Sequence, residues 1–179
     1  SHNTSFSVVR YGNVMGSRGS VIPFFMSIAK GKGGVLPITD KRMTRFMISL
    51  EEGVELVWHA FGNMEGGEIY VKKIPSMKVT DVAYAVDNKA EQEEAGIRPG
   101  EKIHEQMIGI EDALYTYEYP DYFKILPSIN DWAKDKARIG DGIRVSEDFT
   151  YTSDNNVEWM EISELQEWIE KNKNKIGNI

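Results

Sequence analysis

Residues 8–25 read VVRYGNVMGSRGSVIPFF, and they decide how the first part of the chain folds. The short apolar, β-branched run within residues 5–10 is typical of a buried strand. The loop over residues 11–20 contains Gly12, Gly16 and Gly19, and glycine permits positive φ and a close approach of the backbone to a ligand. Ser20 is a suitable N-cap for a helix over residues 21–30. We therefore expect a strand, a glycine-rich loop and a helix in direct succession.

The rest of the chain mixes short strands with helices. The sequence predicts further strands at residues 35–38, 68–71 and 123–126. It predicts helices at residues 50–61, 79–86 and 101–107, and a terminal helix that opens at the capping-box pattern of residues 163–166. The tyrosine-rich segment 115–122 carries no pattern that assigns it to either class.

Two apolar stripes predict which helix faces are buried. The helix over residues 50–61 follows a capping-box pattern at residues 49–52. Its large apolar residues recur at helical spacing, which predicts a stripe that faces the core: Val54, Val57, Trp58 and Phe61. Leu165, Trp168 and Ile169 form a similar face on the terminal helix.

Composition places the chain among folded proteins of single-domain size. It has 179 residues, of which 41% are hydrophobic, enough to bury a core. The absence of cysteine excludes disulfides and thiolate sites and favours a reducing compartment, so we expect a cytoplasmic location. No stretch approaches the roughly 18 apolar residues of a membrane span, so no membrane contact is expected. Residues 1–4 resemble a tag remnant or linker, which leaves residues 5–179 as the folded portion.

Charge excludes one class of partner and indicates another. The net charge of -7 argues against nucleic-acid binding, which requires a basic surface. Five of the seven arginines nevertheless fall in three short segments: Arg10, Arg18, Arg42, Arg45 and Arg98. The planar guanidinium suits a diphosphate because it donates two parallel hydrogen bonds. We expect a local anion site, and simple surface solubility is the alternative.

The residues of a complete redox enzyme are missing from the sequence. No segment combines a strand, a G-x-G-x-x-G turn and a helix, and no tyrosine has a lysine four residues later. His2, His59 and His104 lack the spacing of a metal site. We therefore expect neither a metal nor a catalytic residue in this chain.

Residues 8–25, together with LPITDKRMTRFMISLEEG at 36–53 and GIRPGEKIHE at 96–105, resemble extended short-chain dehydrogenases/reductases. IYVKKIPSMKVTDVA at 69–83 is similar to the inverting UDP-N-acetylglucosamine 4,6-dehydratases that open pseudaminic acid synthesis. YTSDNNVEWM at 151–160 extends the resemblance almost to the C-terminus. The resemblance implies an α/β fold: the last part of a Rossmann sheet and a small α/β substrate lobe, without the N-terminal NADP-binding half.

The resemblance also implies a substrate site. It places Asn13, Arg45, Arg98 and Glu101 at the nucleotide diphosphate or ribose and Thr39 near the uracil. Ordinary structural roles are the alternatives: a turn for Asn13, ion pairs for the arginines, and the N-terminus of its helix for Glu101. Val21, Pro23 and Phe24 are candidates for the apolar wall.

The intact relative would use NADP to convert UDP-N-acetylglucosamine to UDP-2-acetamido-2,6-dideoxy-L-arabino-hexos-4-ulose, with inversion at C5. This chain would supply UDP-sugar binding, would hold no cofactor and would be inactive alone, and the family implies a homo-oligomer. A non-catalytic nucleotide-sugar binding or assembly module remains an alternative, as does a retaining dehydratase or epimerase relative. Without the first half, residues 5–10 would expose a strand edge, which predicts self-association.

Overall fold

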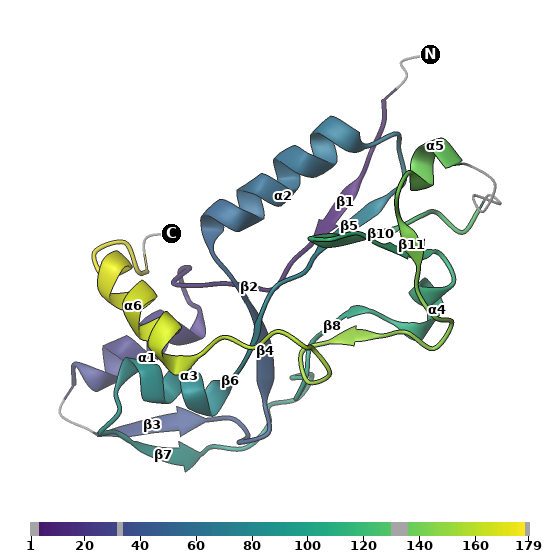
Figure 1. The fold of residues 1–179 in the computed structure, drawn as a ribbon. Coiled ribbons are helices and arrows are strands. Elements are labelled where there is room, and N and C mark those ends of the chain that lie inside the picture. Colours follow the sequence, from purple (N-terminus) through teal and green to yellow (C-terminus); the bar gives the residue numbers. More distant parts are fainter. Residues whose placement is uncertain (1–3, 32–33, 130–135, 178–179) are drawn as a thin grey trace. The chain divides into compact units, whose positions relative to one another are not determined.

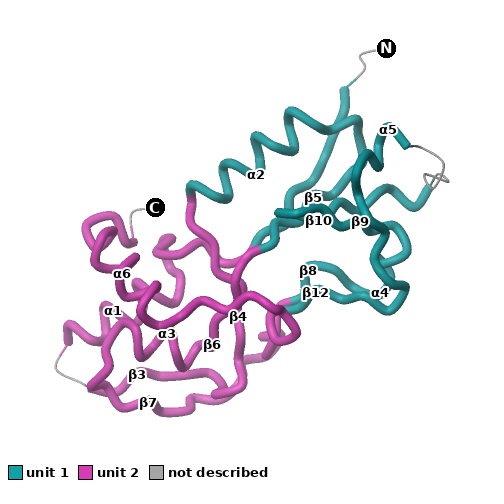
Figure 2. The backbone as a smooth tube through the Cα atoms, viewed as in Figure 1, with its two compact units in different colours: residues 1–11, 51–73, 106–152 teal, residues 12–50, 74–105, 153–179 magenta. Residues whose placement is uncertain are grey.

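The computed structural model describes residues 4–31, 34–129 and 136–177, and it contains both helices and strands (Figure 1). The expected remnant at residues 1–4 therefore lies almost entirely outside the described residues. The chain forms two compact units (Figure 2). The first unit takes residues 1–11, 51–73 and 106–152, and the second takes residues 12–50, 74–105 and 153–179.

A mixed sheet organises the first unit. Its strands are β1 (Val8–Arg10), β5 (Ile69–Lys72), β9 (Thr116–Glu118), β10 (Tyr122–Ile125) and β11 (Ile143–Arg144), in the order β1-β5-β10-β9-β11. β1 runs parallel to β5, with Val9 opposite Tyr70, and the other pairs are antiparallel. The strand at the start of the chain is confirmed, but its burial is not. Val8 is 52% exposed because β1 lies at the edge of the described sheet.

Helix α2 (Leu50–Asn63) packs with a face different from the one expected. Val54 and Val57 are each 45% exposed, Trp58 67% and Phe61 66%, so the prediction of a core-facing stripe is wrong. Buried positions on α2 are Gly53, Leu56 and Ala60. Leu56 and Ala60 pack with Tyr70 of β5, against which Val9 and Tyr122 also lie. These smaller residues repeat at helical spacing too, and they form the face that contacts the sheet residues.

The other elements of the first unit include a strand where a helix was expected. β8 (Gln106–Ile108) pairs with β12 (Tyr151–Thr152), and two short helices, α4 (Ile110–Ala113) and α5 (Lys136–Ile139), complete the unit. Residues 101–105 form no helix, so the predicted helix 101–107 is wrong. The extended backbone pairs Ile108 with Tyr151 and buries Met107 and Ile108. A strand ladder thus satisfies backbone groups for which we had expected helical hydrogen bonds.

The second unit combines two small sheets with three helices. β2 (Asn13–Val14), β4 (Thr44–Ile48) and β6 (Ser76–Lys78) form one sheet, and β3 (Val35–Ile38) pairs in parallel with β7 (Glu91–Glu94). α3 (Val79–Val86) packs against both α1 (Val21–Ala29) and α6 (Ile162–Asn172). The expected face of α6 is confirmed, because Leu165 is buried and Trp168 and Ile169 pack against the same apolar core.

The helices α1 and α6 begin close to the predicted residues, but their capping interactions differ from the predicted ones. Ser20 is the N-cap of α1, yet its hydroxyl makes no capping hydrogen bond. α6 begins at Ile162, and its capping box joins Glu161 and Glu164, so the predicted box at residues 163–166 is wrong. A carboxylate can accept from the N3 amide as a serine hydroxyl does, and Glu161 takes this role two residues earlier.

The glycines of loop 11–20 permit contacts within the protein. A Cβ on Gly12 would lie 2.5 Å from the carbonyl oxygen of Phe46. Gly16 has φ +73°, and a Cβ there would lie 2.7 Å from the Trp168 ring. The close approach expected at this loop is therefore to β4 and α6, and only glycine provides the space for it.

Candidate functional site

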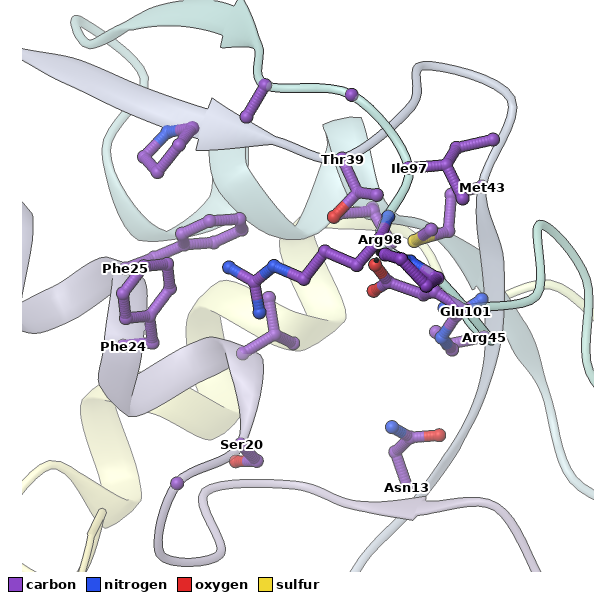
Figure 3. A pocket seen from close by; sticks show the side chains of 17 residues that line it. Asn13, Ser20, Phe24, Phe25, Thr39, Met43, Arg45, Ile97, Arg98 and Glu101 are labelled. Carbon is purple, nitrogen blue, oxygen red and sulfur yellow. Dashed lines mark hydrogen bonds between the residues drawn. The ribbon is translucent and has the colours of Figure 1, made fainter.

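A cavity of about 730 Å³ opens in the second unit (Figure 3). Its lining includes residues of β2, the loop before α1, α1 itself, β3, β4 and the segment 95–101. All five residues expected to contact substrate line this cavity: Asn13, Thr39, Arg45, Arg98 and Glu101. They come from four segments separated by up to 88 positions in sequence, since 101 − 13 = 88. The fold thus brings the predicted site residues together around one space.

Arg98 provides a cation with free donors. Figure 3 shows its side chain crossing the cavity toward Phe24 and Phe25. Among the described residues, the Arg98 guanidinium has no hydrogen-bond or ion-pair partner. Its donors are therefore available to an anion in the cavity.

Glu101 closes the turn that carries Arg98. The Arg98 amide donates to Oε2 of Glu101 at 3.4 Å, and the Glu101 amide donates to the Arg98 carbonyl at 3.0 Å. Gly100 lies within this turn with φ of 82°, and Gly96 precedes it with φ of 86°, a conformation that suits glycine. Glu101 does not lie at a helix N-terminus, because no helix begins there. One of the two roles weighed for Glu101 from the sequence is thereby removed.

Arg45 lines the cavity, and its guanidinium donates hydrogen bonds to main-chain carbonyls. Nη1 donates to the carbonyls of Thr44 at 2.7 Å and Ile103 at 3.0 Å, and Nη2 donates to that of Lys102 at 3.0 Å. The side chain is only 13% exposed. Arg45 therefore ties β4 to the segment that follows Glu101, and it contributes its positive charge from the wall of the cavity.

Glu105 is a residue that the sequence reasoning missed. In the amide orientation that satisfies both groups, the Asn13 nitrogen donates to its two carboxylate oxygens at 2.9 and 3.0 Å. Arg45 Nε lies 3.6 Å from Oε1, and the Phe46 amide donates to Oε2 at 3.3 Å. Burial raises the pKa of Glu105. In the sequence it was one acidic residue among many, so nothing indicated this position.

The backbone of Glu105 is held as firmly as its side chain. Its amide donates to the Ser153 hydroxyl at 2.9 Å, and the Ser153 amide donates to its carbonyl at 2.8 Å. Ser153 is fully buried, and its hydroxyl lies 2.6 Å from that of Thr44 on β4. The Thr44 hydroxyl also lies 2.8 Å from Nδ1 of His104. A network of short hydrogen bonds therefore fixes this carboxylate next to the cavity.

Apolar side chains form another part of the lining. Val21, Phe24 and Phe25 of α1 line the cavity, as do Met43 and Ile97. The Phe24 ring is 44% exposed, which leaves part of its surface available to a flat ligand group. The expectation for Val21 and Phe24 agrees with the lining, whereas Pro23 does not line the cavity. Ser20 also lines it, and its buried hydroxyl has no hydrogen-bond partner among the described residues.

The other arginines of the predicted basic site lie outside the cavity. Arg10 belongs to the first unit and donates to Asp112 and to the Met107 carbonyl, both at 2.8 Å. Arg42 pairs with Asp40 at 2.7 Å, and its hydrogen bonds lower the pKa of Asp40 to about 2. Arg18 is exposed and does not line the cavity. Only two of the five arginines, Arg45 and Arg98, therefore line the cavity. Arg10 and Arg42 pair with nearby carboxylates, and Arg18 lies outside the lining.

The described residues contain no group of three or more histidine, cysteine, aspartate or glutamate residues that could hold a metal ion. No helix in the described ranges is long and apolar enough to span a membrane.

The lining suits an anion joined to a flat ring and to hydroxyl groups. Arg98 and Arg45 supply positive charge, Glu101 supplies a hydrogen-bond acceptor, and Phe24 supplies an apolar face. Polar groups that converge beside apolar side chains in one cavity are typical of small-molecule sites.

Residues 1–127 match the family described as polysaccharide biosynthesis protein. The chain belongs to this family. Within the polysaccharide biosynthesis proteins, it is 50% identical over 171 residues to a UDP-N-acetylglucosamine 4,6-dehydratase (inverting) of Campylobacter jejuni, a match that covers 93% of this chain and 51% of the relative. This likeness confirms the resemblance inferred from the sequence motifs.

Two other matches broaden the comparison. A UDP-glucose 4-epimerase of Rickettsia conorii is 37% identical over 168 residues, covering 90% of this chain and 49% of the relative. The X-ray structure of Pen from Bacillus thuringiensis superposes with a TM-score of 0.80 at 31% identity, covering 97% of this chain and 52% of that one. The α/β fold expected for this polysaccharide biosynthesis protein is confirmed. The chain spans about half the length of the relatives it matches.

Proposed function

We propose that the cavity of the second unit binds UDP-N-acetylglucosamine, and that the chain is the substrate-binding portion of an inverting 4,6-dehydratase. The convergence of Asn13, Thr39, Arg45, Arg98 and Glu101 on one cavity carries this proposal. The 50% identity to a relative named for that activity supports the choice of ligand.

Each part of the ligand has a matching part of the cavity. The Arg98 guanidinium, which has no partner among the described residues, would bind the diphosphate, with the charge of Arg45 behind it. Glu101 would accept hydrogen bonds from the ribose hydroxyls, and Thr39 would lie on the uracil side. Asn13, held by Glu105, would contact the diphosphate or ribose from the loop before α1. The exposed part of the Phe24 ring would cover a flat or apolar face of the ligand.

The glycines of loop 11–20 do not form the pyrophosphate turn of a dinucleotide fold. Such a turn needs glycines that leave space for the pyrophosphate, whereas Gly12 and Gly16 leave space for Phe46 and Trp168. In the whole protein, NADP would be bound by the part that corresponds to the half of the relatives outside this match.

The whole protein would remove water across C5 and C6 of the sugar with inversion at C5. It would act as a homo-oligomer in the cytoplasm, and its product would enter pseudaminic acid synthesis. An epimerase or retaining dehydratase of the same family is the second candidate, supported by the 37% identity to a UDP-glucose 4-epimerase. The identity of 50% to the inverting dehydratase favours the first candidate.

Calorimetric titration of the chain tests ligand and cavity together. UDP-N-acetylglucosamine and UDP should both bind, and uridine should bind at least about tenfold more weakly because it lacks the diphosphate that Arg98 contacts. Equal binding of uridine and UDP would contradict the diphosphate role. No binding of any of the three by a folded chain would contradict the proposal for this chain.

A further inference from the structure

We propose that Glu105 is a positioning residue of the cavity, which holds Asn13 and Arg45 in the orientation that receives the nucleotide sugar. The inference rests on the proposed function and adds a residue that does not itself line the cavity.

The side chain of Glu105 contacts two groups of the wall at once. The Asn13 amide nitrogen lies 2.9 and 3.0 Å from its two oxygens, and Arg45 Nε lies 3.6 Å from Oε1. Asn13 and Arg45 come from different strands, β2 and β4. One carboxylate therefore sets the relative position of two lining residues.

Electrostatics argues against a direct role for this carboxylate in ligand binding. A negative charge next to a diphosphate lowers affinity, and partly removing a carboxylate from water has a cost of its own. Its partners offset both costs, because Arg45 and the Asn13 and Phe46 nitrogens face its oxygens. The benefit to the site is a fixed amide: the carboxylate holds the Asn13 nitrogen toward itself, which turns the amide oxygen away from Glu105.

Glu105 can position Asn13 and Arg45 because its own backbone is held in place. The Glu105 backbone exchanges two hydrogen bonds with Ser153, which is buried and bonded to Thr44 on the same strand as Arg45. A binding residue that is held before the ligand arrives loses less conformational entropy on binding. Glu105 thus links the ordering of the cavity wall to the interior of the second unit.

Titration of the full chain with UDP-N-acetylglucosamine gives the first test. Glu105→Ala should weaken binding about tenfold, the effect of losing one charge-assisted hydrogen bond. Glu105→Gln keeps an acceptor for Asn13 and should stay within about threefold of the original chain. Glu93→Ala, which removes an exposed carboxylate of β7 that does not line the cavity, is the matched control and should bind unchanged.

A double-mutant cycle separates positioning from general damage. Asn13→Ala should weaken binding in the original chain and add little in the Glu105→Ala chain, because Glu105 acts through Asn13. Fully additive losses would overturn the inference. Equal binding by Glu105→Ala and the original chain would overturn it while leaving the proposed function intact.

A ligand-free measurement keeps the two claims apart. In NMR spectra of the labelled chain, the side-chain amide resonances of Asn13 should shift in Glu105→Ala and shift far less in Glu105→Gln. Unchanged Asn13 resonances in Glu105→Ala would overturn the positioning role whether or not the chain binds UDP-N-acetylglucosamine. Failure of the original chain to bind, with the NMR shift present, would overturn the proposed function alone.

Discussion

The main-chain amide of Arg98 donates to the carboxylate of Glu101 at 3.4 Å, and the amide of Glu101 donates back to the carbonyl of Arg98 at 3.0 Å. These two bonds close a turn that contains Gly100 with positive φ, and the turn directs Arg98 into the cavity (Figure 3). The two residues proposed to contact the nucleotide sugar are thus joined by hydrogen bonds within one turn.

Substitution of Glu101 should weaken ligand binding with little loss of stability. Glu101→Ala removes both the acceptor for ribose hydroxyls and a bond that holds the Arg98 turn, so affinity for UDP-N-acetylglucosamine should fall about tenfold. The melting temperature should hardly change because the turn lies at the surface. Calorimetry and thermal unfolding check both, with the exposed Glu147→Ala of the first unit as control. A large loss of stability with unchanged affinity would contradict this role.

Gly16→Ala should destabilise the chain more than Gly19→Ala. Both glycines have positive φ, of 73° and 77°, so alanine at either position should lower the free energy of unfolding by about 1 kcal/mol through backbone strain. Only the Gly16 Cβ would also lie 2.7 Å from the Trp168 ring, which adds overpacking of about 1–3 kcal/mol. Urea unfolding measures the difference, and equal losses would show that the packing of loop 11–20 against α6 is wrong.

Asp40 should make the stability of the chain depend on pH in the acid range. Hydrogen bonds from Arg42 hold the pKa of folded Asp40 at about 2, below its usual value of 3.8. The ionised form is therefore favoured by folding, so this contribution is fully present above about pH 4 and is lost as the pH falls through 2. Denaturant unfolding at several pH values should show a smaller slope in Asp40→Asn between pH 4 and 2. An unchanged slope would show that Asp40 does not titrate as described.

The two faces of α2 should respond differently to substitution. Leu56→Ala should cost about 2–4 kcal/mol because Leu56 is buried with Tyr70. Trp58→Ser should change the free energy of unfolding by no more than about 0.5 kcal/mol because its side chain is 67% exposed. A large loss for Trp58→Ser would indicate that the apolar stripe is buried in solution.

The edge position of β1 leads us to expect self-association. Val8 lies on a strand that pairs with β5 and with no second strand among the described residues, and it is 52% exposed. Unpaired strand edges bind other edges. Light scattering at micromolar concentration should show association that Val8→Lys reduces. A strictly monomeric, folded chain would contradict this prediction.

Local sequence patterns predicted several elements well. The helix at residues 79–86 and the strand at residues 35–38 occur within the bounds expected from their apolar periodicity and their flanking residues. β7 was missed because its sequence, EQEE, lacks the residues typical of strands; it forms through parallel pairing with β3. Pairing of this kind depends on distant residues, which a local pattern does not contain.

Predictions were wrong where the same residues were compatible with two structures. α2 has apolar residues on two faces, and periodicity does not say which one contacts the sheet. Residues 101–107 suit a helix locally, but the pairing of β8 with β12 keeps the end of this segment extended. The five cavity residues came from family resemblance, whereas Glu105 acts through contacts with Asn13 and Arg45 that only the folded chain brings together.

The most direct test of the central claim compares Arg98→Ala with Arg18→Ala in titrations with UDP-N-acetylglucosamine. Both changes remove one exposed arginine, but only Arg98 lines the cavity. The account predicts that Arg98→Ala weakens binding at least about tenfold while Arg18→Ala binds like the original chain. Equal affinity in Arg98→Ala and the original chain would contradict the claim that this cavity receives the diphosphate.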